Sequence, residues 1–302
     1  MKLAMKKLCS PAFASGEPTF AAASLLVFCL TACDIPLQQA DGSMVPDTLG
    51  TARAHLSRTV TVVSYNVNFG LARCTDGVTC TADAETLSVL RSLDADVILL
   101  QETTPAWEKV LRPLLAERYP YATFHDPSTS PASGIAAFSK FAIDADELLP
   151  SPVGWFPANR LVIDTAHGPL EVLNVHLRPM VSESGSWISG YFTTDHFRRR
   201  EIDAYLPKLA SDLPTVIAGD FNEDTNGDAF GHLEDIGFES ALAKADPQAT
   251  TWRWQYASMP LSLRLDHVAY EKSAFELVSA EVVEAGSSDH MPVKVVLRRR
   301  PT

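Results

Sequence analysis

Apolar runs of strand length recur along most of this chain, and most of them end in a polar residue able to bind a metal or a phosphate. The runs occupy residues 60–67, 97–100, 134–139, 160–165, 170–176, 215–219, 266–270 and 292–297. Several are too apolar for a half-exposed strand, and helix-period segments at 81–93 and 194–209 separate some of them. The pattern predicts a mixed α/β fold, an α+β sandwich in which two packed sheets are flanked by helices within one domain of roughly 240 residues.

The polar residues at the ends of the apolar runs indicate where a functional site lies. They are Asn66, Asn68, Gln101, Glu102, Asn174, His176, Asp220, Asn222, Asp266, His267, Asp289 and His290. One carboxylate after a strand is an ordinary helix cap. Because strand ends converge on one edge of a sheet, this many placements predict a single site that draws on the whole length of the domain.

Six short motifs carry these polar residues. They read, in chain order, Ser64-Tyr-Asn-Val67, Leu100-Gln-Glu102, Asn174-Val-His-Leu177, Ala218-Gly-Asp-Phe-Asn222, Leu265-Asp-His-Val268 and Ser288-Asp-His-Met-Pro292. In this order, over residues 59–298, they resemble the endonuclease/exonuclease/phosphatase superfamily, whose members include DNase I, abasic-site endonucleases, bacterial sphingomyelinases and inositol polyphosphate phosphatases. The resemblance implies the DNase I-like four-layer architecture, with two mixed β-sheets packed between helices.

The residue types suit metal-assisted hydrolysis of a phosphate ester. A hard divalent cation neutralises charge on the phosphoryl oxygens and prefers oxygen ligands, so Glu102 is the leading candidate ligand for Mg²⁺, with Mn²⁺ or Ca²⁺ as alternatives. A water must also be aligned and deprotonated, which suits a histidine held by a carboxylate. By resemblance, that pair is His290 with Asp266.

The resemblance assigns the other site residues as well. Asp220 and Asn222, two apart on one strand and so on one face, would orient the nucleophile and hold the transition state. His176 would stabilise the phosphate or protonate the leaving oxygen, and it argues against abasic-site repair, whose enzymes usually carry Tyr here. Asn66 would support the metal carboxylate and the phosphate. Asp289 would complete the metal site or orient the loop of the general base.

Other features leave alternatives open. Asn68 stands where repair enzymes usually place an Asp, which puts a second metal site in doubt. Arg178 is a candidate phosphate clamp, and so is the triplet Arg198-Arg199-Arg200, for which a solvated helix face is the preferred interpretation. Trp252 and Trp254 suit stacking on a base or a lipid headgroup, with a place in the core or at its rim as the default interpretation.

The N-terminus has the layout of an export signal. Three lysines precede an almost wholly apolar stretch at 20–30, which closes with Leu30-Thr31-Ala32-Cys33 and resembles a bacterial lipobox. We therefore expect a lipoprotein signal peptide over residues 1–32, lipidation of Cys33 and a flexible tether over 33–58. An ordinary secretory signal is the alternative. Either places the domain outside the cytoplasm, and lipidation would anchor it in the bacterial envelope on the periplasmic or extracellular face.

Cysteine usage and charge bear on the same question. Once the signal is removed and Cys33 acylated, Cys74 and Cys80 are the cysteines that remain, and in an oxidising compartment they would close a small loop as a disulfide. Two free thiols are the alternative. The chain has 25 basic and 37 acidic residues, a formal charge of −12, which disfavours tight binding of long nucleic acid without excluding a nuclease that meets DNA briefly.

These features predict a metal-dependent phosphodiesterase, built on residues 59–302, that uses direct attack of water and is most similar to an exported nuclease. Its substrate would be nucleic acid or a phospholipid headgroup, and its contact with the membrane would run through the N-terminal lipid. A sphingomyelinase-like or inositol-phosphate-type phosphatase is the alternative, and an inactive binding module of the same fold is a second one. We expect a monomer.

Overall fold

The computed structural model describes residues 58–180, 194–256 and 259–301. All of them belong to one compact unit, Thr48–Thr302. The predicted signal peptide, Cys33 and the predicted tether up to residue 57 lie outside the described residues. In the part of the chain that the structure describes, no helix is long and apolar enough to cross a membrane.

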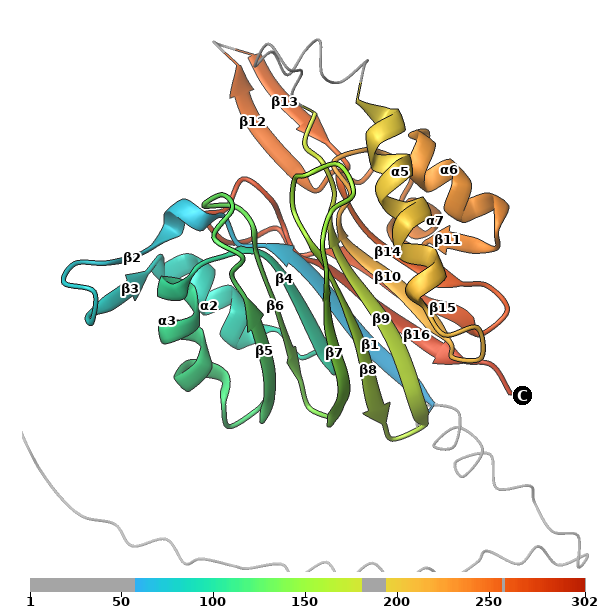
Figure 1. The fold of residues 1–302 in the computed structure, drawn as a ribbon, viewed down its shortest axis with the longest axis horizontal. Coiled ribbons are helices and arrows are strands. Elements are labelled where there is room, and N and C mark those ends of the chain that lie inside the picture. The colour runs from blue at the N-terminus through green and yellow to red at the C-terminus, as the bar shows by residue number, and fades with distance from the viewer. Residues whose placement is uncertain (1–57, 181–193, 257–258, 302) are drawn as a thin grey trace, which may run out of the picture. The chain divides into compact units, whose positions relative to one another are not determined.

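Two large mixed sheets form the centre of the described part of the chain (Figure 1). The first has the order β15 (Phe275–Val282), β16 (Val293–Arg299), β1 (Thr59–Asn66), β4 (Val97–Thr103), β6 (Gly134–Ser139) and β5 (Tyr121–His125). The second has the order β11 (Phe238–Ser240), β14 (Asp266–Glu271), β10 (Thr215–Asp220), β9 (Gly168–His176), β8 (Ala158–Thr165) and β7 (Ile143–Leu149). Each contains one parallel pair, β1 with β4 and β9 with β10.

Helices and two small hairpins make up the other elements of the described residues. The helices are α2 (Ala84–Ser92), α3 (Pro105–Leu115), α5 (Asp195–Tyr205), α6 (Asp228–Asp235) and α7 (Ala241–Ala245), with the 3-10 turns η1 (Phe69–Leu71) and η2 (Leu206–Lys208). The hairpins are β2 (Ala72–Cys74) with β3 (Cys80–Ala82), and β12 (Trp252–Tyr256) with β13 (Met259–Leu263). Figure 1 shows α2 and α3 on one side of the sheets and α5 and α6 on the other.

Both faces of each sheet are buried, which explains why the runs are apolar without alternation. In β1, Val62 packs between the two sheets, whereas Val63 belongs to the core under α2 and α3. In β10, Val216 faces the other sheet and Ile217 packs toward α5 and α6. Since successive strand residues point to opposite faces, each central strand contributes to two cores. The four-layer α/β architecture predicted from the sequence is confirmed.

Buried apolar residues of the described chain form three core clusters. Their buried members lie between Val60 and Leu297. All eight predicted apolar runs lie in strands of the two large sheets or overlap them, whereas four strands of these sheets, β5, β7, β11 and β15, escaped the sequence analysis. All four are edge strands. β11 is only three residues long, and β5, β7 and β15 are partly exposed, so their side chains do not form an apolar run. A chain of residues 48–302 thus contains the whole of the described hydrophobic core.

A buried pair of amides joins the two sheets. Gln101 of β4 donates from Nε2 to Oδ1 of Asn174 in β9 at 2.7 Å. The Nδ2 of Asn174 donates in turn to the carbonyl oxygens of Leu100 and Ala136, at 3.3 and 3.1 Å. Both side chains are fully buried. The contact therefore fixes the position of β9 over β4 along the strand direction.

Cys74 and Cys80, the predicted pair, are joined by a disulfide that spans the β2–β3 hairpin. Asp76 shapes the turn between them, because its Oδ1 accepts the backbone N–H of Val78 at 2.9 Å. The hairpin lies beside α3.

Buried charges hold α5 against the second sheet. Arg198, 1% exposed, donates from Nε to Oε2 of Glu223 at 2.8 Å. Glu201 accepts the backbone N–H of Arg178 at 2.8 Å and the hydroxyl of Ser151 at 2.7 Å. Burial outweighs these contacts and raises the pKa of both Glu201 and Glu223 to about 7.

The first prediction concerns the amide pair. Asn174→Leu removes the 2.7 Å acceptor of Gln101 Nε2, which keeps only Ser64 Oγ at 3.3 Å, and it removes the Nδ2 donor to the buried carbonyl groups of Leu100 and Ala136. Since each buried unsatisfied group costs about 1–3 kcal/mol, the free energy of unfolding should fall by about 2–4 kcal/mol in urea titrations. Thr123→Val is the matched control, because the Thr123 hydroxyl is buried without a hydrogen-bond partner. An equal urea midpoint in Asn174→Leu and the parent protein would contradict the assigned role.

The second prediction concerns Glu201. Its folded pKa, about 7, lies above the ordinary value of 4.5, so between these values the folded chain binds more protons than the unfolded chain. The favourable contribution is complete below about pH 4.5 and is lost as the pH rises through 7, by up to about 3 kcal/mol. Glu201→Gln should flatten this decline in unfolding free energies measured from pH 5 to 8. The exposed Glu117→Gln should leave the profile unchanged, and an unchanged profile in Glu201→Gln would refute the assignment.

Candidate active site

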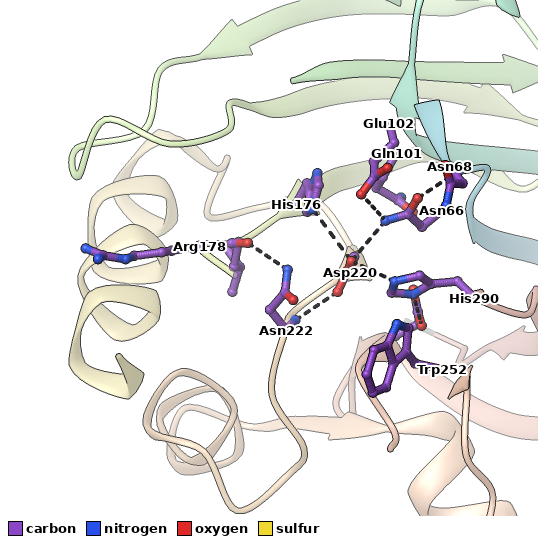
Figure 2. A network of polar contacts seen from close by, with 12 residues as sticks. Asn66, Asn68, Gln101, Glu102, His176, Arg178, Asp220, Asn222, Trp252 and His290 are labelled. Carbon is purple, nitrogen blue, oxygen red and sulfur yellow. Dashed lines mark hydrogen bonds and ion pairs between the residues drawn. The ribbon is translucent and has the colours of Figure 1, made fainter. Parts of the chain in front are cut away.

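The predicted site residues meet at the edge where the strands of the two parallel pairs end (Figure 2). They are Asn66, Glu102, His176, Asp220, Asn222, Asp266, Asp289 and His290. The sheet register pairs His176 with Asp220 and Asp220 with Asp266. Because paired residues on neighbouring strands direct their side chains to the same face, these three form one row across the second sheet. Asn66 reaches the row from the first sheet.

His290 and Asp266 form a buried hydrogen-bonded pair. Nδ1 of His290 lies 2.8 Å from Oδ2 of Asp266, which is fully buried. Nε2 of His290 lies 3.6 Å from Oδ2 of Asp220. Burial disfavours the imidazolium, but the negative charges of Asp266 and Asp220 outweigh burial and raise the pKa of His290 to about 10. The hydrogen bond to Asp266 holds the imidazole ring in one orientation, with Nε2 directed toward Asp220.

Asp220 is the centre of the cluster and is 1% exposed. Its Oδ2 accepts Nδ2 of Asn66 at 3.1 Å and lies 3.6 Å from Nε2 of both His176 and His290. Burial, followed by the charge of Asp266, raises the pKa of this carboxyl group, against the opposing effect of the two histidines. Gly219, which precedes it, has φ +147°, and a Cβ there would lie 1.9 Å from the carbonyl oxygen of Val175. Only glycine lets β10 approach β9 so closely at this point.

Glu102 is placed by a β-bulge. The β4–β6 register shifts between Gln101 and Thr103, and Glu102 has a left-handed backbone with φ +58°. Bulges of this kind re-aim one side chain at the end of a strand. The carboxylate accepts Nδ2 of Asn66 at 3.1 Å and the backbone N–H of Phe69 at 3.2 Å, and burial raises its pKa. Both donors are neutral, so the negative charge of Glu102 remains available to a cation.

Asp289 is held by two neutral donors. Its Oδ1 accepts Nδ2 of Asn68 at 2.9 Å, and its Oδ2 accepts Nε1 of Trp252 at 3.1 Å. An Asp at position 68 would set two carboxylates against each other here, whereas the amide donates. Trp254 lies parallel to Trp252, with 6.2 Å between ring centroids, and is 52% exposed. The bond from Trp252 was missed in the sequence, where only the i, i+2 spacing of the two tryptophans hinted at a shared face.

His176 is neutral at physiological pH. Burial lowers its pKa to about 4, although the charge of Asp220 acts in the opposite direction. Its ring stacks on Phe156 at a centroid distance of 4.0 Å. Sequence reasoning did not identify Phe156, which lies outside every predicted strand. The stack fixes the ring so that Nε2 is directed toward Asp220 (Figure 2).

The expectation that Asp220 and Asn222 share a strand face is wrong. Strand β10 ends at Asp220, and Asn222 has a left-handed backbone with φ +52° that turns the chain out of the sheet. Asn222 still belongs to the site, because its N–H donates to Oδ1 of Asp220 at 2.9 Å. Its Nδ2 donates to the carbonyl oxygen of Leu177 at 3.0 Å.

The candidate phosphate clamps lie elsewhere. The Arg178 guanidinium stacks over Phe197 at 4.0 Å and points away from Asp220 (Figure 2). Arg198 is buried in its ion pair with Glu223, which corrects the view of the triplet as a solvated face. Of the triplet, Arg200 is exposed. Arg178 packs against α5 and Arg198 belongs to it, so neither contacts the row formed by His176, Asp220 and Asp266, which is called the catalytic row below.

The charge balance of the site favours a cation. Four carboxylates gather here, those of Glu102, Asp220, Asp266 and Asp289. Among the described residues, no lysine or arginine lies within 4.0 Å of any of them. Hard oxygen donors in excess of positive charge are what a divalent cation requires. The residues present therefore fit a metal at Glu102.

A second group also has ligand spacing. The ligand atoms of Asp220, Asp266 and His290 all lie within 4.8 Å of one another, which makes these residues a possible Asp/His metal site. However, Asp266 and Nδ1 of His290 already share a hydrogen bond. The oxygen atoms of Glu102 accept hydrogen bonds from neutral donors only, which leaves this carboxylate more available to a cation than the bonded pair.

Solved structures of similar fold share this architecture. An endonuclease/exonuclease/phosphatase from Beutenbergia cavernae aligns with a TM-score of 0.62 at 20% identity, over 80% of this chain and 72% of that one. The catalytic domain of human Nocturnin aligns with a TM-score of 0.58 at 19% identity, over 82% of this chain and 96% of that one. A humanized TDP2 from D. rerio aligns with a TM-score of 0.58 at 16% identity, over 80% of this chain and 100% of that one. At these identities the similarity shows the fold.

The family assignment rests on the sequence and not on the similarity of fold. No curated protein is significantly similar to the chain in sequence. The model of the Endonuclease/Exonuclease/phosphatase family matches residues 63–290, which include all the catalytic candidates from Asn66 to His290. The chain therefore belongs to the endonuclease/exonuclease/phosphatase family, as its six motifs predicted.

Proposed function

We propose that this protein is a metal-dependent phosphodiesterase that hydrolyses its substrate by direct attack of water. The observation that carries the proposal is the buried His290–Asp266 pair, whose Nε2 is directed toward Asp220 beside Asn66 and Glu102. Hydrolysis of a phosphate ester needs a held base, groups that bind the phosphoryl oxygens and a cation site, side by side. The cluster contains all three.

His290 removes the proton from the attacking water. Nε2 is the nitrogen that does so, because Nδ1 is already bonded to Asp266. Asp266 keeps the ring in this orientation and stabilises the imidazolium that forms. Water attacks the phosphorus directly, so the proton on Nε2 is the only one that the protein takes up in this step.

The remaining residues bind the phosphate. His176, neutral because it is buried, donates from Nε2 to a phosphoryl or leaving-group oxygen. Asp220 orients the water between the two histidines, and Asn66 ties this carboxylate to Glu102. Asn222 and its left-handed turn hold Asp220 in place through the backbone N–H.

The cation would be held by Glu102 with support from Asn66, and Mg²⁺ is the proposed ion. When bound, it neutralises charge on the phosphoryl oxygens and offsets the carboxylates that raise the pKa of His290. Asp289 acts on the loop of the base, since both of its oxygens accept hydrogen bonds from Asn68 and Trp252.

A nuclease-like phosphodiester substrate is favoured over a polyphosphate. Recognition of several phosphates needs several cations. Among the described residues near the row, Arg178 is covered by aromatic rings and Arg198 is occupied by Glu223. A sphingomyelinase-like activity on a phospholipid headgroup remains the alternative. The inactive binding module loses support, because every predicted catalytic side chain is present at the site.

The protein is proposed to act outside the cytoplasm as a monomer anchored by a lipid on Cys33. The Cys74–Cys80 disulfide supports this location, since such bonds persist in oxidising compartments. The lipobox-like sequence before Cys33 supports the anchor.

The third prediction tests the base. His290→Ala should lower kcat by about a thousandfold on bis(p-nitrophenyl) phosphate with Mg²⁺, because general-base catalysis contributes about 10²–10⁴-fold. His125→Ala is the matched control, since His125 forms a comparable pair with Asp146 at 2.7 Å, outside the site. Plasmid DNA and sphingomyelin assayed in parallel separate the two substrate classes. Absence of turnover of every ester with Mg²⁺, Mn²⁺ or Ca²⁺ would favour the inactive binding module.

The fourth prediction tests the cation site. Chelation should abolish activity, and Glu102→Gln should raise the Mg²⁺ concentration for half-maximal activity by at least about tenfold, because one negative oxygen ligand becomes neutral. Isothermal titration of Mg²⁺ should show the same weakening without any substrate. Glu108→Gln on α3 is the control. Equal Mg²⁺ affinity in Glu102→Gln and the parent would move the cation away from Glu102.

A further inference from the structure

A cationic depression lies at the end of the domain away from the catalytic row. Its volume is about 450 Å³, and it is lined by Arg58, His167, Arg299, Arg300 and Pro301. Four of these five residues carry basic side chains. In a chain with a formal charge of −12, a basic lining of this kind is a local exception.

The depression and the catalytic site occupy opposite ends of the same strands. Arg58 precedes β1, whose last residue is Asn66, and His167 precedes β9, whose last residue is His176. Arg299 ends β16, which runs antiparallel to β1. At about 3.3 Å per residue, eight or nine strand residues separate the two places by about 25–30 Å. The depression is therefore not part of the catalytic site.

Two guanidinium groups are held in place by backbone carbonyls. Arg299 donates from Nη1 to the carbonyl oxygen of His167 at 2.6 Å, and Arg300 donates from Nε to those of Lys272 and Phe275, both at 3.0 Å. Gly168, with φ +94°, makes room, because a Cβ there would lie 3.2 Å from Nη1 of Arg299. Each guanidinium has five N–H donors, so most remain for a ligand.

These charges have no acidic partner among the described residues. Within residues 58–180, 194–256 and 259–301, no carboxylate lies within 4.0 Å of Arg58, Arg299 or Arg300, whereas the neighbouring Arg298 pairs with Glu276 at 3.2 Å. Burial alone shifts the pKa of Arg299, and it shifts it downward. Like charges that converge without a counter-charge repel one another, and an anion bound between them relieves this repulsion.

We propose that the depression binds the phosphate headgroups of an anionic phospholipid surface. Guanidinium groups bind phosphate oxygens in pairs of parallel hydrogen bonds, which suits a headgroup lying between Arg299 and Arg300. The acidic remainder of the domain is repelled by the same surface. The domain therefore stands on its basic end, with the catalytic row facing away from the lipid.

The position of Arg58, at the start of the domain, favours a membrane surface as the ligand of the depression. Arg58 lines the depression and directly follows the proposed tether that begins at Cys33. The tether proposed from the sequence precedes Arg58 over 33–57, and a flexible chain of that length would have a root-mean-square span of about 30 Å, so an anchor on Cys33 would keep this end of the domain close to the lipid. The choice of occupant rests on the proposed anchor, and it does not depend on the phosphodiesterase activity.

The fifth prediction uses residues 48–302, which hold the whole of the described core and lack the signal segment. Vesicles of phosphatidylcholine with phosphatidylglycerol should bind this chain in flotation assays, and vesicles of phosphatidylcholine alone should not. Each arginine near an anionic surface contributes about fivefold in affinity. R58Q/R299Q/R300Q should therefore bind about a hundredfold more weakly. Arg58→Gln alone, whose side chain has no hydrogen bond or ion pair to a described residue, should bind about fivefold more weakly without disturbing the fold.

A charge-matched control separates this surface from net charge. R73Q/R91Q/R200Q neutralises three exposed arginines elsewhere and should bind anionic vesicles within about twofold of the parent. Hydrolysis of bis(p-nitrophenyl) phosphate should be equal in both triple variants and the parent, which shows that the variants are folded. If the parent hydrolyses no ester, vesicle binding still decides this inference.

Five results would overturn the proposal, and the first four concern vesicles and oligonucleotides. They are equal binding to neutral and anionic vesicles, equal losses in the two triple variants, unchanged binding in R58Q/R299Q/R300Q, and tighter binding to an oligonucleotide than to anionic vesicles. Binding of inorganic phosphate by a parent protein that binds no anionic vesicle would identify a site for the free ion, and would also overturn the proposal.

Discussion

The amide contact between Gln101 and Asn174 is the constraint on which the active site depends. Each side chain lies in the parallel pair of its own sheet, and neither can slide along the other without leaving buried amide groups unpaired. Glu102 directly follows Gln101, and His176 lies two residues beyond Asn174. The same contact that aligns the two sheets therefore sets the distance between Glu102 on one side of the site and His176 on the other.

Neutral donors accompany almost every carboxylate at the site. Asn66, Asn68 and Trp252 all place N–H groups against acidic oxygens, where an arginine or lysine would have neutralised them. This arrangement fixes the carboxylates without cancelling their charge. It explains why burial raises the pKa of Glu102 while the carboxylates raise that of His290. The protein thus concentrates negative charge at one edge of the sandwich, which a bound cation would offset.

Much of the fold follows from the sequence because the central strands are buried on both faces. A strand such as β10, apolar at every position from Val216 to Ala218, can belong only to an inner layer. The edge strand β7 mixes exposed acidic residues with partly buried apolar ones, and its pattern carries no comparable signal. The polar residues at the ends of the inner strands indicated the site, because an apolar core offers polar side chains no hydrogen-bond partners.

What the sequence could not supply are the local turns and the directions of long side chains. Asn222 leaves the strand through a left-handed residue, and an i, i+2 argument assumes an extended backbone that is not there. Arg178 follows a site residue closely in the chain yet turns toward Phe197 on α5. The direction of a long side chain depends on aromatic and acidic partners from distant segments. The local sequence pattern does not predict where those partners lie.

The parallel indoles of Trp252 and Trp254 give the site an optical signature of its own. Two stacked chromophores at fixed spacing couple their transitions, and one of them donates a hydrogen bond to the carboxylate of Asp289. Any rearrangement of the loop that carries His290 changes both the coupling and the electric field on that indole. Among the five tryptophans of the chain, this pair therefore gives near-ultraviolet circular dichroism and tryptophan emission a component that follows the state of the loop that carries His290.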